Sequence, residues 1–420
     1  MSLQLVRQAH LIDPVQGLDQ VQDVLVRDGV IEAIAPQIEL PDADVQVIEA
    51  QGCYLGPGLV DLYSTSGEPG YEDRETLAQL IDAAMAGGFT RVHLLPQTQP
   101  ALDHPGAVQQ LFSRMPRHTA LSLKVWGALS AGIRGEQLSE LKELLAEPVV
   151  GLSDGAPLQD MVMVQRLLDY VKPLGVPLAL WPCLSSLARD GVIRDGIYAL
   201  NFGLPSMSVA AETSALAALL ELIEQAQSPP PIHLMRISTA RSVQMIAEAK
   251  ARNLPITAST PWTHLMYDSR ALRQYDPMLR LDPPLGNPQD RDELRAGVAA
   301  GVIDAIAVDH RAYTYEEKTV PFSQAPPGCP GYAIAFPLLW QSLVAEGAWS
   351  ASTLWKAIST LPAQCLDQEP PTLEVGQVAE MILFNPNYPP EDVPWSPESI
   401  QGSVQHRWGF ATVASSFPGA

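Results

Sequence analysis

Short apolar runs alternate with stretches of helical periodicity from Pro57 to about Cys365. The runs favour buried strands, and the longer stretches, with apolar residues three and four apart, favour amphipathic helices. This alternation predicts an α/β fold, a (β/α)8 TIM-like barrel. An open doubly wound sheet is the alternative, which the lack of a G-x-G-x-x-G motif after the first strand disfavours. The expected strands are Leu59–Tyr63, Arg91–Leu95, Ala120–Trp126, Val149–Leu152, Pro177–Trp181, Ile232–Ile237, Pro255–Ser259 and Ala305–Val308, and the expected helices include Glu75–Ala86, Asp160–Val171, Ala210–Gln225, Ala240–Ala251 and Asp290–Ala300.

The two ends of the chain carry strand patterns of another kind. Before residue 57, short strands are joined by turns, and Asp28-Gly29 is typical of a two-residue hairpin. This segment is too short to fold alone, so we expect it to pair with the strand pattern at Glu374–Phe384. The prediction is a small, composite, β-sandwich-like domain made of residues 1–56 and 366–420, with the barrel at residues 57–365.

Composition and charge narrow the function. The 420 residues carry 26 Lys+Arg against 47 Asp+Glu, a formal charge of −21, which disfavours nucleic acid and anionic membranes as partners. The four cysteines are scattered, so we expect free thiols rather than disulfides or a zinc knuckle. With no visible signal peptide and no apolar stretch of about 18 residues, we expect a soluble cytoplasmic protein.

Several motifs, in order along the chain, resemble one family. Residues 57–70, PGLVDLYSTSGEPG, are similar to the PGLIDxHxHxREPG segment of dihydroorotases in the amidohydrolase superfamily. Residues 87–90 (GGFT), 95–98 (LPQT) and 303–310 (IDAIAVDH) resemble that family's GGFT, MPNT and IDAIATDH. Further matches are STARS at 238–242, DPPL at 282–285, EEK at 316–318 and APPG at 325–328, so the resemblance covers about residues 1–385.

The resemblance implies a metal-dependent hydrolase of pyrimidine biosynthesis that interconverts dihydroorotate and carbamoyl-aspartate. In such an enzyme one or two divalent ions polarise the scissile carbonyl and generate hydroxide, and an aspartate acts as general base and acid. Zinc there needs imidazole and carboxylate ligands. The family's ligand set therefore predicts which side chains an active relative must carry.

All four histidine ligand positions hold other residues in this chain. Tyr63 and Thr65 replace the HxH of the first strand, the fifth strand ends Leu180–Cys183 without a histidine, and Arg236 stands before the Ser-Thr pair after the sixth. Arg236 places a fixed positive charge where a dication would sit, which opposes metal binding. We therefore expect neither metal nor other cofactor.

Only carboxylates remain as metal ligands. Asp154, in a version of the family's SDDG with one aspartate missing, and Asp309 at the end of the eighth strand are the two that the resemblance leaves. Two carboxylates alone do not build a catalytic zinc geometry.

The substrate-binding positions have changed too. The arginine that clamps the substrate carboxylate in the family corresponds to Gly67, and its asparagine partner corresponds to Gln97. Asp282 replaces the asparagine of NPPLR and adds negative charge. The resemblance assigns Asp309 to the base position, which we interpret as vestigial and expect to be hydrogen-bonded to backbone or to Arg236. Gln97, Arg236 and Asp282 then form a vestigial substrate pocket.

Two histidines near these positions are expected to pack rather than to act. His233 lies three residues before Arg236, so strand alternation points the two side chains to opposite sides. His264 lies where the family has TPHHL, with one residue inserted, and we expect it outside the pocket.

The leading hypothesis is an inactive dihydroorotase homologue kept as a non-catalytic subunit. The chain resembles pseudo-dihydroorotases that accompany aspartate transcarbamoylase in some bacteria, which implies the catalytic subunit of that enzyme as partner, and a homo-oligomer. Two alternatives stay open. One is an active cyclic-amide hydrolase with an altered or single-metal zinc site, and the other is a sensor that binds an anion through Arg236 and Gln97 without turnover.

Overall fold

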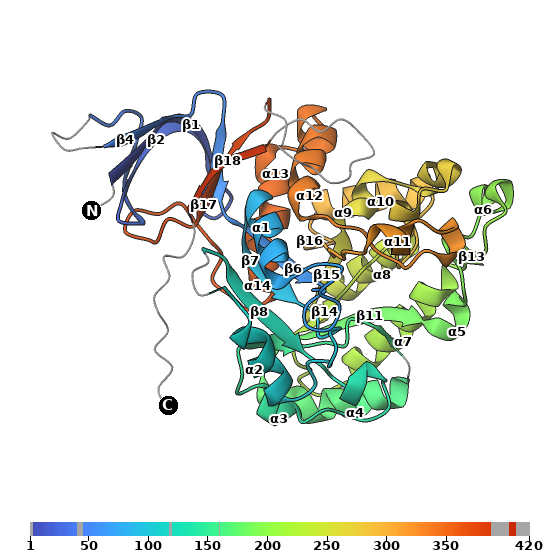
Figure 1. Cartoon of the computed structure of the whole chain (residues 1–420). Helices are drawn as coiled ribbons and strands as arrows, with labels where there is room; N and C mark the ends of the chain where they lie inside the picture. The colour runs from blue at the N-terminus through green and yellow to red at the C-terminus, as the bar shows by residue number, and fades with distance from the viewer. Residues whose placement is uncertain (1–2, 40–44, 117–119, 159, 388–402, 409–420) are drawn as a thin grey trace.

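A computed structural model describes the chain except residues 1–2, 40–44, 117–119, 159, 388–402 and 409–420. A parallel barrel sheet is surrounded by helices, and a smaller mixed sheet lies beside it (Figure 1). Among the described residues, no helix is both long enough and apolar enough to cross a bilayer.

The barrel sheet runs in the order β6, β7, β8, β9, β11, β14, β15, β16, with neighbouring strands parallel. β16 returns to β6 where the Thr65 N–H donates to the His310 carbonyl at 2.9 Å. The predicted (β/α)8 barrel is therefore confirmed. Its strands are β6 (Leu59–Ser64), β7 (Phe89–Leu94), β8 (Ser122–Gly127), β9 (Val149–Leu152), β11 (Leu178–Leu184), β14 (Ile232–Leu234), β15 (Ile256–Pro261) and β16 (Ala305–Ala307), and β10 (Pro157–Leu158) pairs with β11.

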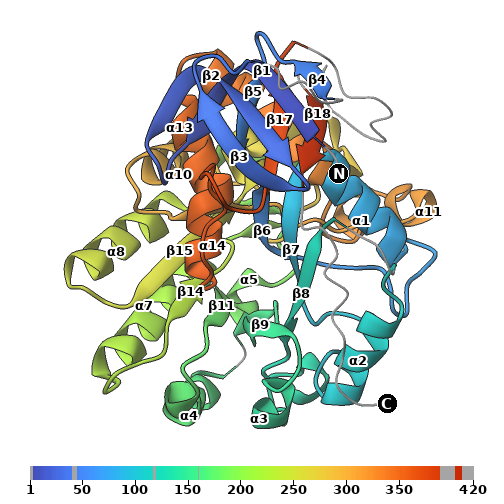
Figure 2. The same ribbon diagram turned by 90° about the vertical axis from the view of Figure 1, so that its left-hand side faces the viewer.

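Helices cover the outside of this sheet (Figure 2). In the first of them, Thr76 and Gln79 form a capping box that satisfies first-turn N–H groups, and Leu77, Leu80 and Ile81 bury one face. The helices are α1 (Leu77–Ala86), α2 (Pro105–Ser113), α3 (Leu141–Leu144), α4 (Met161–Val171), α5 (Ser185–Ala188), α6 (Ile197–Phe202), α7 (Ala210–Gln225), α8 (Ala240–Ala251), α9 (Trp262–Met266), α10 (Pro288–Ala299), α11 (Tyr315–Lys318), α12 (Tyr332–Leu339), α13 (Ala351–Trp355) and α14 (Leu361–Cys365).

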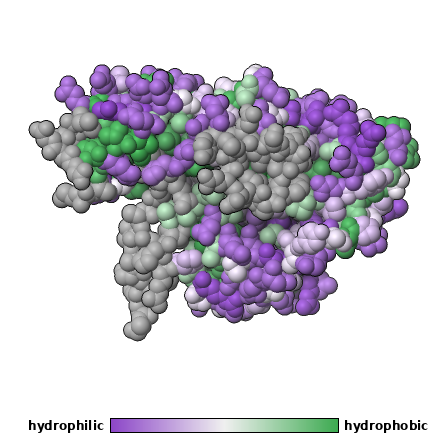
Figure 3. All heavy atoms as spheres, turned by 45° about the horizontal axis from the view of Figure 1, so that its top comes forward, coloured by the Kyte–Doolittle hydropathy of each residue, from purple (hydrophilic) through white to green (hydrophobic). Residues whose placement is uncertain are grey.

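An excursion between β11 and α7 was not predicted from the pattern. It holds α5, α6 and a two-stranded sheet of β12 (Ile193–Arg194) and β13 (Ser206–Met207). On α6, Ile197 and Leu200 are 61% and 80% exposed. Figure 3 shows a mainly hydrophilic face with hydrophobic areas at both ends, one over the small mixed sheet and one where α6 lies in Figure 1. The short apolar runs between β11 and α7 therefore belong to this excursion and form no strand of the barrel sheet.

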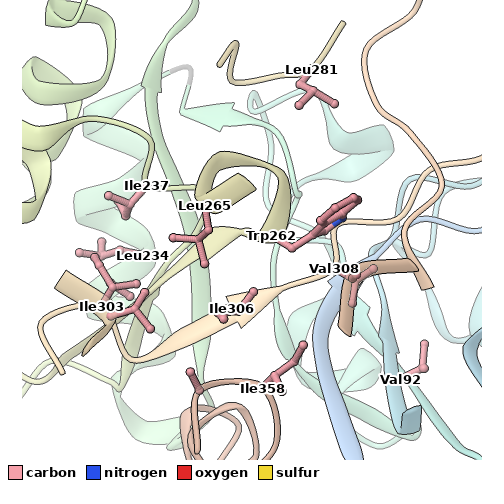
Figure 4. Close-up of a cluster of buried hydrophobic side chains, with 14 of the residues drawn as sticks. Val92, Leu234, Ile237, Trp262, Leu265, Leu281, Ile303, Ile306, Val308 and Ile358 are labelled. Atoms are coloured by element: carbon pink, nitrogen blue, oxygen red, sulfur yellow. The ribbon is translucent and has the colours of Figure 1, made fainter. Parts of the chain in front are cut away.

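Buried apolar side chains form two layers in the barrel. One cluster gathers Val60, Trp126, Ala179, Met235 and Ala305, and because these come from strands around the whole sheet, it fills the barrel interior. A larger cluster lies between strands and helices, and Figure 4 shows part of it. The close packing of both layers fixes the strand ends that carry the site.

The smaller sheet combines both ends of the chain, as the fold prediction required. Leu383 lies opposite Leu55 in the antiparallel pair of β17 and β5, and a 2.6 Å ion pair between Arg91 and Glu380 joins this region to barrel strand β7. The order is β18-β17-β5-β1-β2-β3, with β4 beside β1. The limits 1–56, 57–365 and 366–420 stay predictions, since part of the last segment lies outside the described residues. The strands are β1 (Leu3–Asp13), β2 (Leu18–Arg27), β3 (Val30–Ala35), β4 (Gln46–Glu49), β5 (Tyr54–Pro57), β17 (Met381–Asn385) and β18 (Ser403–Trp408).

Candidate functional site

The ends of the barrel strands bring most of the sequence-predicted residues to one face. Tyr63 lies near the end of β6 and Trp181 lies in β11, while Arg236 and Asp309 each follow their strand by two residues. The carboxyl ends of parallel strands meet at one end of a barrel, so these side chains converge there.

The buried Arg236 and the partly buried Asp309 form a bidentate ion pair. Nε of Arg236 donates to Oδ2 of Asp309 and Nη2 donates to Oδ1, both at 2.7 Å. The third nitrogen, Nη1, donates to the Gly155 carbonyl at 2.8 Å. Burial disfavours the charged guanidinium, but the charge and hydrogen bonds of Asp309 outweigh burial and raise the pKa of Arg236. Of the two partners that the sequence left open for Asp309, backbone or Arg236, the structure shows Arg236.

The backbone at both partners is left-handed. The φ angle is 54° at Arg236 and 48° at Asp309. Such conformations cost non-glycine residues about 1–3 kcal/mol each, so surrounding contacts must hold them. Tyr63 supplies two of these contacts, because its hydroxyl accepts the Arg236 N–H at 3.0 Å and its carbonyl accepts the Asp309 N–H at 3.2 Å.

This backbone geometry also explains why β14 is shorter than the predicted strand Ile232–Ile237. The strand ends at Leu234, because extended backbone cannot continue through a residue with positive φ.

Aromatic rings wall in the guanidinium. Cζ of Arg236 lies 4.8 Å from the Trp181 ring and 5.6 Å from the Tyr63 ring, within cation–π range. Burial raises the pKa of the Tyr63 phenol, so the ring stays neutral. Tyr63, at a histidine position of the family, and Trp181, beside another, therefore both pack against the guanidinium of Arg236.

The cavity beside this pair is very small. Its volume is about 20 Å³, and its lining includes Arg236, His264, Asp282, Asp309 and Arg311. A cavity needs roughly 10–15 Å³ to hold one water molecule. The space next to Asp309 therefore admits about one water and no substrate-sized molecule.

Asp282 lies at the solvent-exposed rim of this cavity. The surrounding protein reduces its hydration and raises the pKa of the carboxyl, while Arg280, Arg236 and Arg311 act in the opposite direction. Asp282 thus belongs to the same site as Arg236 and Asp309, as the sequence predicted.

His264 also lines the cavity, and the expectation that it lies outside is wrong. Its Nε2 lies 3.1 Å from the Pro283 carbonyl and its Nδ1 lies 3.2 Å from the Thr263 hydroxyl. The short helix α9 directly after β15 turns it inward, which strand periodicity could not show. Burial lowers the pKa of His264 to about 4, so the ring is neutral.

His233 is a packed core histidine, but it does not point away from Arg236 as predicted. Its ring nitrogens contact the Thr257 hydroxyl at 2.9 Å and the Ser259 hydroxyl at 2.8 Å, and Ser259 in turn contacts the Tyr63 hydroxyl at 3.0 Å. Both His233 and Arg236 thus reach Tyr63, because strand alternation ends before Arg236. Burial lowers the pKa of His233 to about 3.

Gln97 lies in a second, larger cavity on the other side of Arg311. This cavity measures about 200 Å³. The Gln97 amide accepts from Nη2 of Arg311 at 2.9 Å and donates to the Gly155 carbonyl at 3.0 Å. Sequence reasoning missed Arg311, although a cation directly after Asp309 and His310 at a strand end was a usable signal.

Gly67 lines the same second cavity, and the backbone of Tyr71 and Glu75 packs directly against it. A Cβ added at Gly67 would come within 2.5 Å of the Glu75 carbonyl and 2.7 Å of the Tyr71 carbonyl. No side chain at this position can therefore extend into the cavity without a shift of the backbone.

Asp154 is not brought together with Asp309. Its carboxylate accepts from the Ser130 N–H at 3.0 Å and from the Ser130 hydroxyl at 2.6 Å, and it lines another cavity. Burial raises its pKa, against the hydrogen bonds from Ser130. A metal shared by Asp154 and Asp309 has no support in this geometry.

The donor set does not fit the metal that the resemblance implies. Both oxygens of Asp309 are taken by Arg236, and a guanidinium stands where an imidazole would bind. Within the described part of the chain, no three His, Cys, Asp or Glu side chains form a group that could hold a metal ion. A catalytic zinc needs three such ligands and an open position.

Comparisons with known proteins agree with the fold and with the motifs. No protein-family model matches the chain. A probable dihydroorotase-like protein of Synechocystis is 43% identical over 416 residues, 92% of each chain. A dihydroorotase of Pelobacter propionicus is 32% identical over 412 residues, 95% of this chain and 96% of that protein.

Solved structures are similar in fold at lower identity. The L-hydantoinase of Arthrobacter aurescens has a TM-score of 0.83 at 17% identity over 98% of both chains. The D-hydantoinase of a Thermus species has a TM-score of 0.77 at 20% identity, over 96% of this chain and 93% of that one. Given relatives above 30% identity along more than nine tenths of its length, the chain belongs to the dihydroorotase family of the amidohydrolase superfamily.

Proposed function

We propose that this dihydroorotase-like chain is catalytically inactive and serves as a structural subunit with the catalytic subunit of aspartate transcarbamoylase. The observation that supports inactivity is the Arg236–Asp309 ion pair. It occupies the barrel mouth, the space at the carboxyl ends of the barrel strands, beside a cavity of about 20 Å³. The family's chemistry needs a metal-bound hydroxide and a free carboxylate base in that space.

The proposed partnership has a separate support. It rests on the resemblance to pseudo-dihydroorotases that accompany aspartate transcarbamoylase, together with a barrel whose scaffold contacts are intact. A subunit of this kind needs the fold and its surface, not the chemistry of the mouth.

Turnover tests the inactivity. The purified protein, with and without added zinc, is assayed for hydrolysis of dihydroorotate and of a hydantoin, beside an active dihydroorotase as positive control. We expect no rate above the uncatalysed reaction. Zinc-dependent turnover that Asp309→Asn abolishes would show an active enzyme with an altered site.

Co-elution tests the partnership. The protein is mixed with the aspartate transcarbamoylase of the same cell and resolved by size-exclusion chromatography with light scattering. We expect one complex that contains both chains. Separate elution at micromolar concentrations of both would remove the structural role and leave the turnover result unaffected.

A further inference from the structure

The mechanism of the family does not explain Arg236, which the geometry places among the ends of several barrel strands. Arg236 lies in the space that the resemblance gives to a metal ligand, and the residues around it do not fit a metal. We propose that Arg236 is an internal cation that takes over the structural work of a bound metal, neutralising Asp309 and tying the strand ends together. This inference rests on the proposed inactive function and deepens it.

The contacts of Arg236 reach residues that lie on or just after four other strands. Its guanidinium binds Asp309 after β16 and the Gly155 carbonyl after β9, and it stacks against Trp181 in β11. Its backbone N–H binds the Tyr63 hydroxyl from β6. A metal centre joins strands in the same way, by collecting ligands from several of them at one point.

The electrostatics favour this cation over a free ion. The Arg236 side chain is 2% exposed and that of Asp309 is 14% exposed, so without Arg236 the carboxylate would be a poorly hydrated charge. The chain already carries a formal charge of −21, which adds to the need for local neutralisation. A guanidinium satisfies both carboxylate oxygens with parallel N–H donors, a geometry that a lysine cannot copy.

A covalently attached cation has a consequence that a metal lacks. It cannot be removed by a chelator, and the raised pKa of Arg236 keeps it charged throughout the physiological range. The strand ends should therefore stay tied without any added ion.

The wild-type protein provides the first test. Its melting temperature is measured after dialysis against EDTA and again with one equivalent of zinc, and zinc uptake is followed by calorimetry. We expect the same melting temperature in both and no stoichiometric uptake. A fall with EDTA, or tight binding of one zinc, would overturn the inference.

Chemical rescue provides the second test. Arg236→Ala should lower the melting temperature by about 10 °C, because it leaves a buried carboxylate unpaired. Guanidinium chloride at about 10 mM, far below the molar concentrations that denature proteins, should restore part of the loss, whereas equal sodium chloride should not. Rescue by zinc in place of guanidinium, or equal rescue by sodium, would contradict the proposal.

The matched control is Met235→Ala. This neighbour is buried in the interior cluster together with Tyr63 and Trp181, and its truncation removes apolar contacts but leaves no carboxylate unpaired. Guanidinium should not rescue it. Should the Arg236→Ala protein not fold, Arg236→Lys takes its place, because it keeps the charge but loses the two parallel N–H donors. This variant should fold with a melting temperature below that of the wild type. The chelation test on the wild type does not depend on either variant. Turnover and co-elution do not enter these results, so the two proposals fail separately.

Discussion

Two carboxylates of this barrel, the buried Asp61 and the partly buried Asp309, are held in opposite ways. Asp61, in β6, is fully buried and accepts from the Ser64 hydroxyl at 2.5 Å, the Val308 N–H at 2.9 Å and the Tyr332 hydroxyl at 2.9 Å. Burial raises its pKa to about 7. Asp309 is neutralised by a guanidinium and sits on strained backbone.

The difference teaches that residues that support the barrel can be kept while the residues around a family site position are exchanged. Asp61 belongs to the PGLVD segment that resembles the family, and its neutral donors join β6 to β16 and α12. Asp309 also matches the family, but the residues around it are exchanged. The same fold thus gives one acid neutral hydrogen-bond donors and the other a guanidinium that donates to both of its oxygens.

The largest effect should come from Asp61→Ala. We expect the free energy of unfolding to fall by about 4 kcal/mol, because three buried donors lose their acceptor. Urea denaturation measures it, with the exposed Asp82→Ala in α1 as control, for which we expect about 0.5 kcal/mol or less. A loss below about 1 kcal/mol for Asp61→Ala would break the comparison.

Trp181→Ala measures how much a residue beside the Arg236–Asp309 pair contributes to stability, for comparison with Asp61. We expect a loss of about 3 kcal/mol in the free energy of unfolding, because a large buried ring is removed from beside Arg236. The loss should stay below that of Asp61→Ala, since the mouth can take up water. A larger loss than that of Asp61→Ala would mean that the mouth, not the scaffold acid, holds the barrel.

His233→Gln tests the pH dependence. The folded pKa of about 3 lies below the ordinary value of 6.5, so the unfolded chain binds more protons and stability is lost as the pH falls below 6.5. Between pH 7 and pH 5 the wild type should lose about 2 kcal/mol relative to the variant, whose amide does not titrate. Parallel stability curves in denaturant melts at both pH values would refute this.

The smallest effect should come from Thr76→Ala. The capping box of α1 is formed by Thr76 and Gln79 within the helix itself, and its loss should lower the free energy of unfolding by about 1 kcal/mol. Because the capping box is formed within α1 while Trp181 packs against Arg236, we expect the effects of Thr76→Ala and Trp181→Ala to add in the double variant. Strong non-additivity would show that the mouth and the outer helix are coupled.

The barrel and the emptied ligand set could be predicted from sequence because both are read from local signals. Alternating apolar runs set the strands, and the motifs in order set the positions of Tyr63, Arg236 and Asp309. Neither inference depends on which residues distant in the sequence are in contact.

The sequence alone thus determined which side chains stand at the ends of the strands and which ligands are missing. The sequence left two partners open for Asp309, and only the tertiary structure decided that it pairs with Arg236 across 73 residues and that Arg311 holds Gln97 across 214. It also decided that His264 turns inward and that the cavity beside Asp309 measures only about 20 Å³. The physical reason is that positive φ angles and long-range hydrogen bonds override strand alternation, and these exist only once the barrel is packed.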